Sequence, residues 1–172
     1  MLPVKNIDEY KSDKIVSFKK AIGIISRLKS RGKKIGLCHG GFDLLHAGHV
    51  KHFESAKKLC DVLFVSITSD KFVALRKGSG RPVFNEKLRE YMIASIEYVD
   101  YAVISNFKTG IETIKALKPS YYIKGEDYYN KNDAEIEAER HSISSVGGKI
   151  RYTKCPKLST TEIIAYIKDN IL

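Results

Sequence analysis

Apolar positions along the chain follow two different spacings. Short, nearly continuous apolar runs predict buried strands, while apolar residues three or four positions apart predict amphipathic helices. The predicted strands lie at 34–38, 62–67, 101–104, 121–123 and 149–152. The predicted helices lie at 13–31, 49–59, 85–96, 111–117, 133–145 and 159–167. Because the two kinds of segment alternate, the pattern predicts βαβ crossovers and an α/β fold, with helices on both faces of a parallel sheet of about five strands.

The organisation of the chain favours one domain over residues 1–172. We find no internal repeat and no low-complexity linker, and glycine and proline are confined to short turns. A chain of 172 residues is long enough for one sizeable core. Within it, residues 1–31 would form an N-terminal extension and helix, and residues 34–172 a Rossmann-like core.

Composition narrows the class of protein. No apolar run approaches the length that spans a bilayer, and the segment 1–10 lacks the apolar stretch of a secretory signal. The three cysteines have no CxxC spacing, which argues against a disulfide scaffold and against a zinc site. We therefore expect a cytoplasmic protein with no membrane partner.

The net charge of +10 indicates an anionic partner. Such an excess attracts polyanions or phosphorylated small molecules, although a solvated basic face that serves only solubility is the alternative. A nucleic-acid-binding module is a competing hypothesis, since the chain also has ten tyrosines. However, Tyr121, Tyr122, Tyr128 and Tyr129 do not form a recognisable stacking platform, so no nucleic-acid partner is expected.

Four segments suited to phosphate follow predicted strands. They are the glycine-rich turn at 40–41, the basic loop at 76–81, the segment 124–127 and the segment 154–161. In open parallel sheets, ligands bind beyond the carboxyl ends of the strands. The topology therefore brings these four segments to one edge of the sheet.

The first of these segments contains a histidine pair at the start of a helix. Gly40 and Gly41 allow a tight turn, and the following helix directs free N–H groups at the space in front of it. His46 and His49 are three residues apart, so both imidazoles can face one anion. Donors placed where negative charge develops on an α-phosphate and on leaving pyrophosphate lower the barrier to nucleotidyl transfer.

Other roles for the same residues are open. His46, His49 and His52 could ligate a metal, but no acidic or cysteine ligand accompanies them, so we expect no protein-held metal. They could also be ordinary polar residues at a helix start, which is the favoured interpretation for His52. The glycines could serve only as a turn.

The segment Gly40-Gly41-Phe42-Asp43-Leu44-Leu45-His46-Ala47-Gly48-His49 resembles the signature of the HxGH nucleotidylyltransferase superfamily, in its cytidylyltransferase-like branch. The resemblance extends from about Lys14 to the C-terminus and includes LRKGSGRPV at 75–83, VDYAV at 99–103 and IKGEDY at 123–128. Within the branch, the chain is similar to the enzymes that activate heptose 1-phosphate with ATP and to those that activate glycerol 3-phosphate with CTP.

The resemblance implies a reaction between an NTP and a phosphorylated sugar or polyol. The acceptor's phosphate oxygen would attack the α-phosphorus in line, and pyrophosphate would leave. Mg²⁺ would accompany the nucleotide, held mainly by the triphosphate oxygens. The resemblance also implies a homodimer, to which residues 98–102 and the helix at 85–96 could contribute an interface.

The resemblance implies roles for individual residues. Catalytic roles fall on His46, His49 and Lys77. Nucleotide binding falls on Gly40, Gly41, Phe42, His46, His49, Lys124, Gly125, Glu126, Asp127, Ser159, Thr160 and Thr161. Contacts with substrate phosphate fall on Lys77, Arg81, Arg89 and Lys154.

Several of these residues have a structural alternative. Lys77 could be a solvated lysine in a loop. Arg89 could pair with a structural carboxylate instead of binding phosphate bidentately. Asp43 more readily braces the turn than performs catalysis. Ser159 and Glu162 form a capping box that would exist without any ligand.

The base and the acceptor are open at this stage. Lys154 favours the glycerol 3-phosphate enzymes, whereas the rest of the chain favours the heptose 1-phosphate enzymes. His39 stands where the latter usually have asparagine. A degenerate regulatory nucleotide-binding domain is the remaining hypothesis, which the presence of both histidines disfavours.

Overall fold

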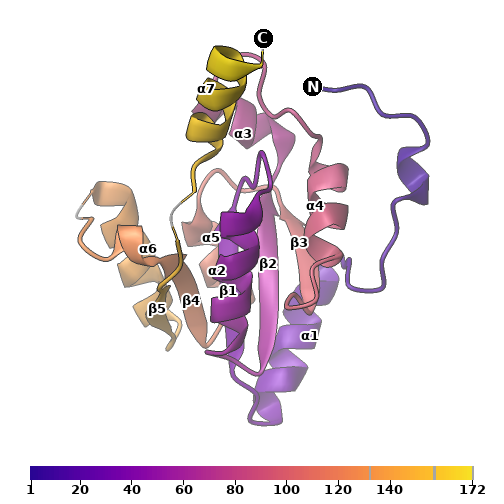
Figure 1. Ribbon diagram of the computed structural model, residues 1–172. Coiled ribbons are helices and arrows are strands. Elements are labelled where there is room, and N and C mark those ends of the chain that lie inside the picture. Colours follow the sequence, from indigo (N-terminus) through magenta and orange to yellow (C-terminus); the bar gives the residue numbers. More distant parts are fainter. Residues whose placement is uncertain (132, 157, 172) are drawn as a thin grey trace.

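The computed structural model describes residues 1–131, 133–156 and 158–171. At its centre is a five-stranded sheet in the order β3-β2-β1-β4-β5, and all four strand pairings are parallel (Figure 1). The strands are β1 (Ile35–Gly40), β2 (Val62–Thr68), β3 (Tyr101–Ser105), β4 (Tyr121–Gly125) and β5 (Lys149–Thr153). The predicted α/β fold with a parallel sheet of about five strands is confirmed.

Helices connect the strands within the described residues. The α-helices are α1 (Phe18–Ser30), α2 (Ala47–Lys57), α3 (Asp70–Lys77), α4 (Glu86–Ala94), α5 (Gly110–Leu117), α6 (Ala134–Ser145) and α7 (Thr160–Asn170). Two short 3₁₀ helices, η1 (Ile7–Glu9) and η2 (Glu126–Tyr128), lie in the N-terminal arm and directly after β4.

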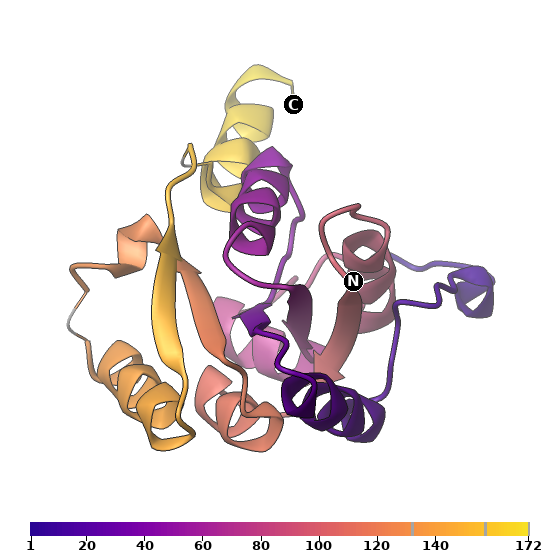
Figure 2. The same ribbon diagram turned by 90° about the horizontal axis from the view of Figure 1, so that it is seen from below.

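The helices cover both faces of the sheet. Seen from below, α1, α5 and α6 lie side by side along one face, while α2 and α4 lie on the other (Figure 2). Each face has its own apolar core. One core joins α1 residues such as Ile25 to β-strand residues such as Leu37, and the other joins α2 and α4 residues such as Phe53 and Ile93 to Val65. This arrangement is a Rossmann-like three-layer fold.

The central strands explain why the sheet forms where it does. In β2, six of seven residues are buried, as expected for a strand covered by helices on both faces. β5 at the edge has the opposite character, since Lys149 and Arg151 alternate as exposed residues with more buried ones. The strong apolar runs therefore specify the middle of the sheet, and the mixed run specifies its margin.

One helix departs from the prediction. Residues 76 and 77 were expected in a basic loop, but they form the last turn of α3. Val73 is the only buried residue of this helix, so no apolar stripe identifies it in the sequence. As a result, Arg76 and Lys77 lie on a rigid element, and only residues 78–84 remain a loop.

The N-terminal segment contributes to the fold in two ways. Val16 donates its N–H to Ala102 O at 3.1 Å, and Ala102 donates to Lys14 O at 2.9 Å, so this segment covers part of the β3 edge. Further towards the terminus, the ring of Tyr10 meets Tyr91 of α4 edge-to-face, with centroids 5.2 Å apart. The predicted extension and helix thus pack against the core.

None of the described helices is long and apolar enough to cross a membrane. Because all five strands are parallel, their carboxyl ends meet at one edge of the sheet. The motif turn after β1, the segment 69–84 after β2, η2 after β4 and the segment after β5 all lie at this carboxyl edge.

Candidate active site

The histidine pair lies at the start of α2, where β1 delivers the chain to the carboxyl edge. The two imidazole rings of His46 and His49 are stacked, with centroids 3.8 Å apart and planes inclined by 24°. The ring of Phe42 supports His49 edge-on at 5.3 Å, and Phe42 is itself buried. A Cβ atom on Gly48 would approach the His46 ring to 3.1 Å. Glycine at this position therefore lets the two rings stack.

The local electrostatics keep both histidines neutral. Burial, with the neighbouring His46 as the second cause, lowers the pKa of His49 from 6.5 to about 3. Burial also lowers the pKa of His46, with Lys77 adding to the effect. His49 Nδ1 accepts the backbone N–H of His46 at 3.3 Å. In the neutral ring the proton is then on Nε2, which is free to donate to an anion.

Asp43 ties the motif turn to the loop at 78–84. Its buried carboxylate accepts the N–H of Val83 at 2.9 Å and of Phe84 at 3.3 Å, and it pairs with Arg81 Nε at 2.6 Å. Its backbone carbonyl also accepts from Arg81 Nη2 and, at 2.7 Å, from Lys77 Nζ. The predicted bracing role of Asp43 therefore has a direct geometric basis.

Lys77 donates to the motif turn at Asp43 O although it is an exposed residue. Burial of its ammonium group at Asp43 lowers the pKa of Lys77, and Arg81 lowers it further. The charge of Lys77 in turn contributes to the lowered pKa of His46 and of His49. Lys77 thus belongs electrostatically to the same site, which disfavours the alternative of a lysine in open solvent.

Arg89 is completely buried and its guanidinium is engaged with protein atoms. It donates to Asp70 Oδ1 at 2.7 Å, to Gly41 O at 2.5 Å and to Phe84 O at 3.0 Å. This corresponds to the structural alternative considered for Arg89. A direct contact with substrate phosphate would require it to give up these hydrogen bonds, so its effect in this structure is to position the motif turn.

The start of α7 meets the motif turn from the other side. Ser159 and Glu162 form the predicted capping box, with Ser159 N–H donating to Glu162 Oε2 at 3.1 Å. Thr160 Oγ1 donates to Leu44 O at 3.2 Å. The amino-terminal end of α7 therefore lies beside the amino-terminal end of α2, and both helix ends direct N–H groups at this region.

A further group of polar side chains lies beneath β4. Lys124 Nζ pairs with Glu139 Oε2 and stacks over the ring of Tyr128 at 4.3 Å. Tyr122 donates its hydroxyl to Glu139 Oε1 at 2.8 Å. Glu139 is buried, and sequence reasoning missed it because it lies in a helix of mixed pattern, 15 residues from Lys124. Lys124 therefore holds Gly125 and η2 in place.

Two other histidines, His39 and His52, lie within hydrogen-bond distance of hydroxyl groups on the strands. His39 Nδ1 lies 2.7 Å from Ser66 Oγ, and burial lowers the pKa of His39 to about 4, with Lys124 as the second cause. His52 Nδ1 lies 2.6 Å from Thr153 Oγ1, and burial lowers its pKa also to about 4. His52 thus links α2 to β5, and its interpretation as a residue without a catalytic role stays a prediction.

The family model described as cytidylyltransferase-like matches residues 37–166, from the strand that leads into the histidine motif to the last helix. The chain belongs to the cytidylyltransferase-like family. The predicted branch of the superfamily is confirmed.

Known relatives of this cytidylyltransferase-like chain are longer. It is 38% identical over 158 residues to the bifunctional protein HldE of Aliarcobacter butzleri, an alignment that covers 91% of this chain and 31% of the relative. It is 39% identical over 170 residues to the HldE of Campylobacter jejuni subsp. doylei, an alignment that covers 95% of this chain and 35% of that relative. The chain thus spans about a third of the length of these curated relatives.

Among solved structures, the lipopolysaccharide core biosynthesis protein from Thermoplasma volcanium GSS1 is 26% identical, with a TM-score of 0.58. This match covers 74% of the cytidylyltransferase-like chain and 100% of the other. The similarity is consistent with the family and supports the fold.

A cavity of about 490 Å³ lies beside η2 and the outer edge of β5 of this cytidylyltransferase-like chain. Two predicted site residues, Glu126 and Lys154, line it. Lys154 is 88% exposed, and its Nζ is 3.8 Å from Glu126 Oε1. The predicted residues therefore form two groups: His46, His49, Lys77 and Arg81 around the motif turn, and Glu126 and Lys154 at this cavity.

Proposed function

We propose that this chain transfers a nucleotidyl group from an NTP to a phosphorylated sugar, with heptose 1-phosphate and ATP as the first pair to test. The stacked pair of neutral imidazoles, His46 and His49, beside the ammonium of Lys77 carries the proposal. The resemblance of the motifs to enzymes that activate heptose 1-phosphate supports this acceptor, together with the similarity to HldE proteins and to a lipopolysaccharide core biosynthesis protein.

The reaction needs donors for developing negative charge and no covalent step on the protein. The acceptor's phosphate oxygen forms a bond to the α-phosphorus while the bond to the leaving pyrophosphate breaks. The Nε2–H of His49 is available to the α-phosphate oxygens, and Lys77 exchanges its contact with Asp43 O for one with phosphate. The free N–H groups of α2 and α7 add donors at the same place.

Mg²⁺ is part of the proposal as a companion of the triphosphate, which would supply most of its ligands. In the described part of the chain, no three His, Cys, Asp or Glu side chains come together in a way that could hold a metal ion. When bound, Mg²⁺ would neutralise phosphate charge. The protein's own task is to position the phosphates with His46, His49 and Lys77.

The decisive experiment compares three alanine variants. His46→Ala and His49→Ala should each lower kcat by about 10²–10³-fold, because each removes a donor to the developing charge. His141→Ala is the matched control, since His141 is an exposed histidine on α6. Circular dichroism melts verify that each variant folds. Near-normal turnover in both motif variants would refute the proposed mechanism.

The acceptor and base are identified by a screen. Four NTPs are combined with heptose 1-phosphate, glycerol 3-phosphate and related phosphates, and released pyrophosphate is measured. Transfer from CTP to glycerol 3-phosphate is the second candidate, because the exposed cation Lys154, whose Nζ is 3.8 Å from Glu126 Oε1, lies at the cavity beside η2. Failure of every combination to release pyrophosphate would favour a regulatory nucleotide-binding domain.

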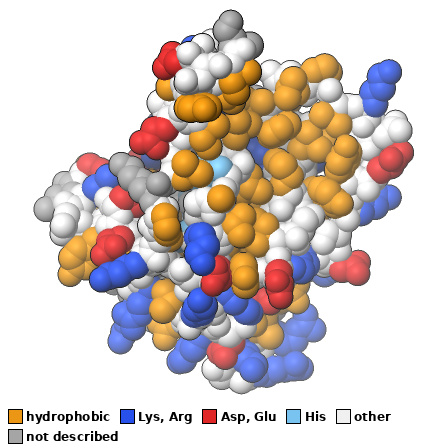
Figure 3. Space-filling model, viewed as in Figure 1, with side chains coloured by type: hydrophobic (Ala, Val, Ile, Leu, Met, Phe, Trp, Pro, Cys, Tyr) orange, Lys and Arg blue, Asp and Glu red, His pale blue; other side chains and the backbone are white. Residues whose placement is uncertain are grey.

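A homodimer in the cytoplasm, without nucleic-acid or membrane partners, completes the proposal. Hydrophobic side chains gather over much of the face seen in Figure 3, which supports an interface there. Tyr98 and the exposed side of α4 are the predicted contributors.

A further inference from the structure

The excess positive charge of the chain is concentrated in one segment. Residues 14–34 contain eight of its thirty Lys and Arg residues and none of its twenty Asp and Glu residues, so the remainder is nearly balanced. In space, Lys and Arg side chains gather at the lower end of the molecule, where α1 lies (Figures 1 and 3). The proposed transfer reaction does not use this region.

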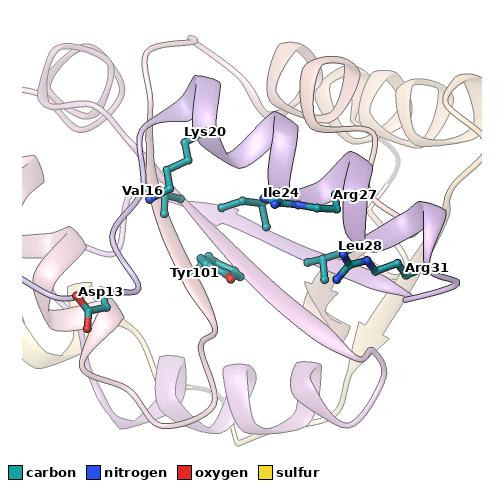
Figure 4. A pocket seen from close by; sticks show the side chains of 8 residues that line it. All are labelled: Asp13, Val16, Lys20, Ile24, Arg27, Leu28, Arg31 and Tyr101. Carbon is teal, nitrogen blue, oxygen red and sulfur yellow. The ribbon is translucent and has the colours of Figure 1, made fainter.

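A cavity of about 380 Å³ lies in the same region, between α1 and the start of β3 (Figure 4). Because Tyr101 is the first residue of β3, the cavity is at the amino-terminal side of the sheet, opposite the carboxyl edge that bears His46 and His49. It is therefore a separate site. Its volume is within the usual range for a binding pocket.

The floor of the cavity is apolar and recessed. Val16 and Ile24 are buried, and Leu28 and Tyr101 are half-buried. Tyr101 is held in place by Phe64, its neighbour on β2, whose ring stacks on it with centroids 4.6 Å apart. A single protruding apolar side chain of a ligand could reach this floor.

The rim bears three cations and one carboxylate, that of the exposed Asp13, so it is cationic on balance. Lys20, Arg27 and Arg31 are exposed and line the cavity, spread over about 16 Å of helix. Arg27 and Arg31 are one turn apart, so both can bind the same carboxylate group or neighbouring ones. In the part of the chain that the structure describes, none of these three side chains has an ion-pair partner.

We propose that this cavity docks an acidic segment of a partner protein, which inserts one apolar side chain between Ile24, Leu28 and Tyr101. Its carboxylates pair with Lys20, Arg27 and Arg31. Charge complementarity selects an anionic partner. A recessed floor beneath protruding cations selects a segment with a projecting side chain over a flat membrane surface, which would meet only the cations. The single tyrosine, backed by Phe64, offers no series of stacking faces to a nucleic-acid strand.

The test uses a fluorescent twelve-residue peptide with one central leucine flanked by glutamates, and a second peptide with serine in place of the leucine. Binding to the full chain is followed by anisotropy at low salt. The leucine peptide should bind saturably with a Kd in the micromolar range, and the serine peptide about tenfold more weakly, because the apolar contact is lost.

Two charge-matched double variants distinguish specific binding at the cavity from nonspecific electrostatic attraction to the chain. The double variant Arg27→Glu, Arg31→Glu should raise the Kd of the leucine peptide at least about tenfold. Lys19→Glu with Lys33→Glu makes the same change in net charge at exposed residues that do not line the cavity, and should leave binding within about threefold. Both variants should retain nucleotidyl transfer and normal melting.

Three results would overturn the proposal. They are equal weakening by both double variants, equal binding of both peptides, and no saturable binding up to about 1 mM, a range that covers weak complexes. Anionic vesicles and duplex DNA are measured in parallel. If binding of vesicles or of DNA depends on Arg27 and Arg31 while binding of the peptide does not, the cavity binds that partner instead.

Discussion

At the scale of single residues, the site is built from ionisable groups held by backbone atoms. Asp43 accepts from the N–H groups of Val83 and Phe84, Arg89 donates to the carbonyl of Gly41, and Lys77 donates to that of Asp43. The histidine motif predicted that His46 and His49 lie together, because its spacing is local. The partners of Arg89 and Lys124 could not be predicted, because Asp70 and Glu139 are distant in sequence and meet them only through the fold.

Replacing Asp43 tests whether its charge holds the loop. Asp43→Asn keeps an oxygen for Val83 and Phe84 but removes the charge that faces Arg81. We expect unfolding free energy to fall by about 2–3 kcal/mol, because a partly buried guanidinium loses its partner. KM for the nucleotide should rise as the loop moves. Urea denaturation of Asp43→Asn, Arg81→Met and the double variant measures the coupling. Strictly additive losses would contradict a direct interaction.

The buried histidines predict a dependence of stability on pH. The pKa values of His39 and His52 are about 4 and that of His49 is about 3, all below the ordinary 6.5 of an unfolded chain. Between these values the unfolded chain binds more protons than the native protein. Stability is therefore fully present above pH 6.5 and declines as the pH falls towards 4.

A single variant isolates one of these contributions. His39→Asn should reduce the slope of unfolding free energy against pH near pH 5 by up to about 1.4 kcal/mol per pH unit, since it removes one titrating group. Urea denaturation across pH 5 to about pH 7 measures the slope. His141→Asn makes the same substitution at an exposed histidine and serves as the control. An unaltered slope in His39→Asn would show that His39 titrates normally in the native protein.

At the scale of elements, regular apolar patterns predicted what the core requires. All five strands and six of the helices lie close to their predicted positions. Five of those helices place an apolar stripe in a core cluster, whereas α7 has no buried residue. α3 was missed because only Val73 is buried, and the two long-range contacts of its ends, Asp70 with Arg89 and Arg76 with Glu135, leave no local pattern. Helix ends were less certain than helix cores, as in α1, which begins after its cap Ser17 and not at residue 13.

The start of α5 gives a sharp test of close packing between elements. A Cβ atom on Gly110 would lie 2.6 Å from Glu139 Oε1 and 2.7 Å from the hydroxyl oxygen of Tyr122. Gly110→Ala should therefore cost about 1–3 kcal/mol of stability and displace the Lys124–Glu139 pair. Gly23→Ala is the matched control, because nothing lies within 4 Å of its added Cβ. Because Gly23 lies in the interior of α1, Gly23→Ala should raise the free energy of unfolding by about 0.5–1 kcal/mol.

Thermal melts and denaturant titrations measure the change in unfolding free energy of both glycine variants. Opposite signs of the two stability changes are expected. If Gly110→Ala were neutral, the contacts of Glu139 and Tyr122 with the start of α5 would be looser than the structure shows. Nucleotide KM in Gly110→Ala would report whether the displaced Lys124 disturbs η2.

At the scale of the whole molecule, charge and apolar surface are distributed unevenly. The basic segment 14–34 lies at one end, and hydrophobic side chains gather on the face seen in Figure 3. Composition predicted an anionic partner but not its place, since a sum over the chain contains no positions. The fold separates the charge of α1 from the proposed nucleotide site, so a nucleotide bound there would not by itself explain the net charge of +10.

The proposed homodimer predicts the effect of a charge on the apolar face. Tyr98 is half-buried and packs beside the core cluster that includes Val99 and Ile93. If Tyr98 and the exposed side of α4 form the interface, Tyr98→Glu should convert a dimer to a monomer in sedimentation velocity, because a desolvated carboxylate is costly. Tyr166→Glu is the matched control on α7, where Tyr166 is 63% exposed, and it should remain dimeric. Normal melting of Tyr98→Glu must accompany the change. A wild-type chain that sediments as a monomer at all concentrations would refute the dimer, and dissociation by both variants would place the interface elsewhere.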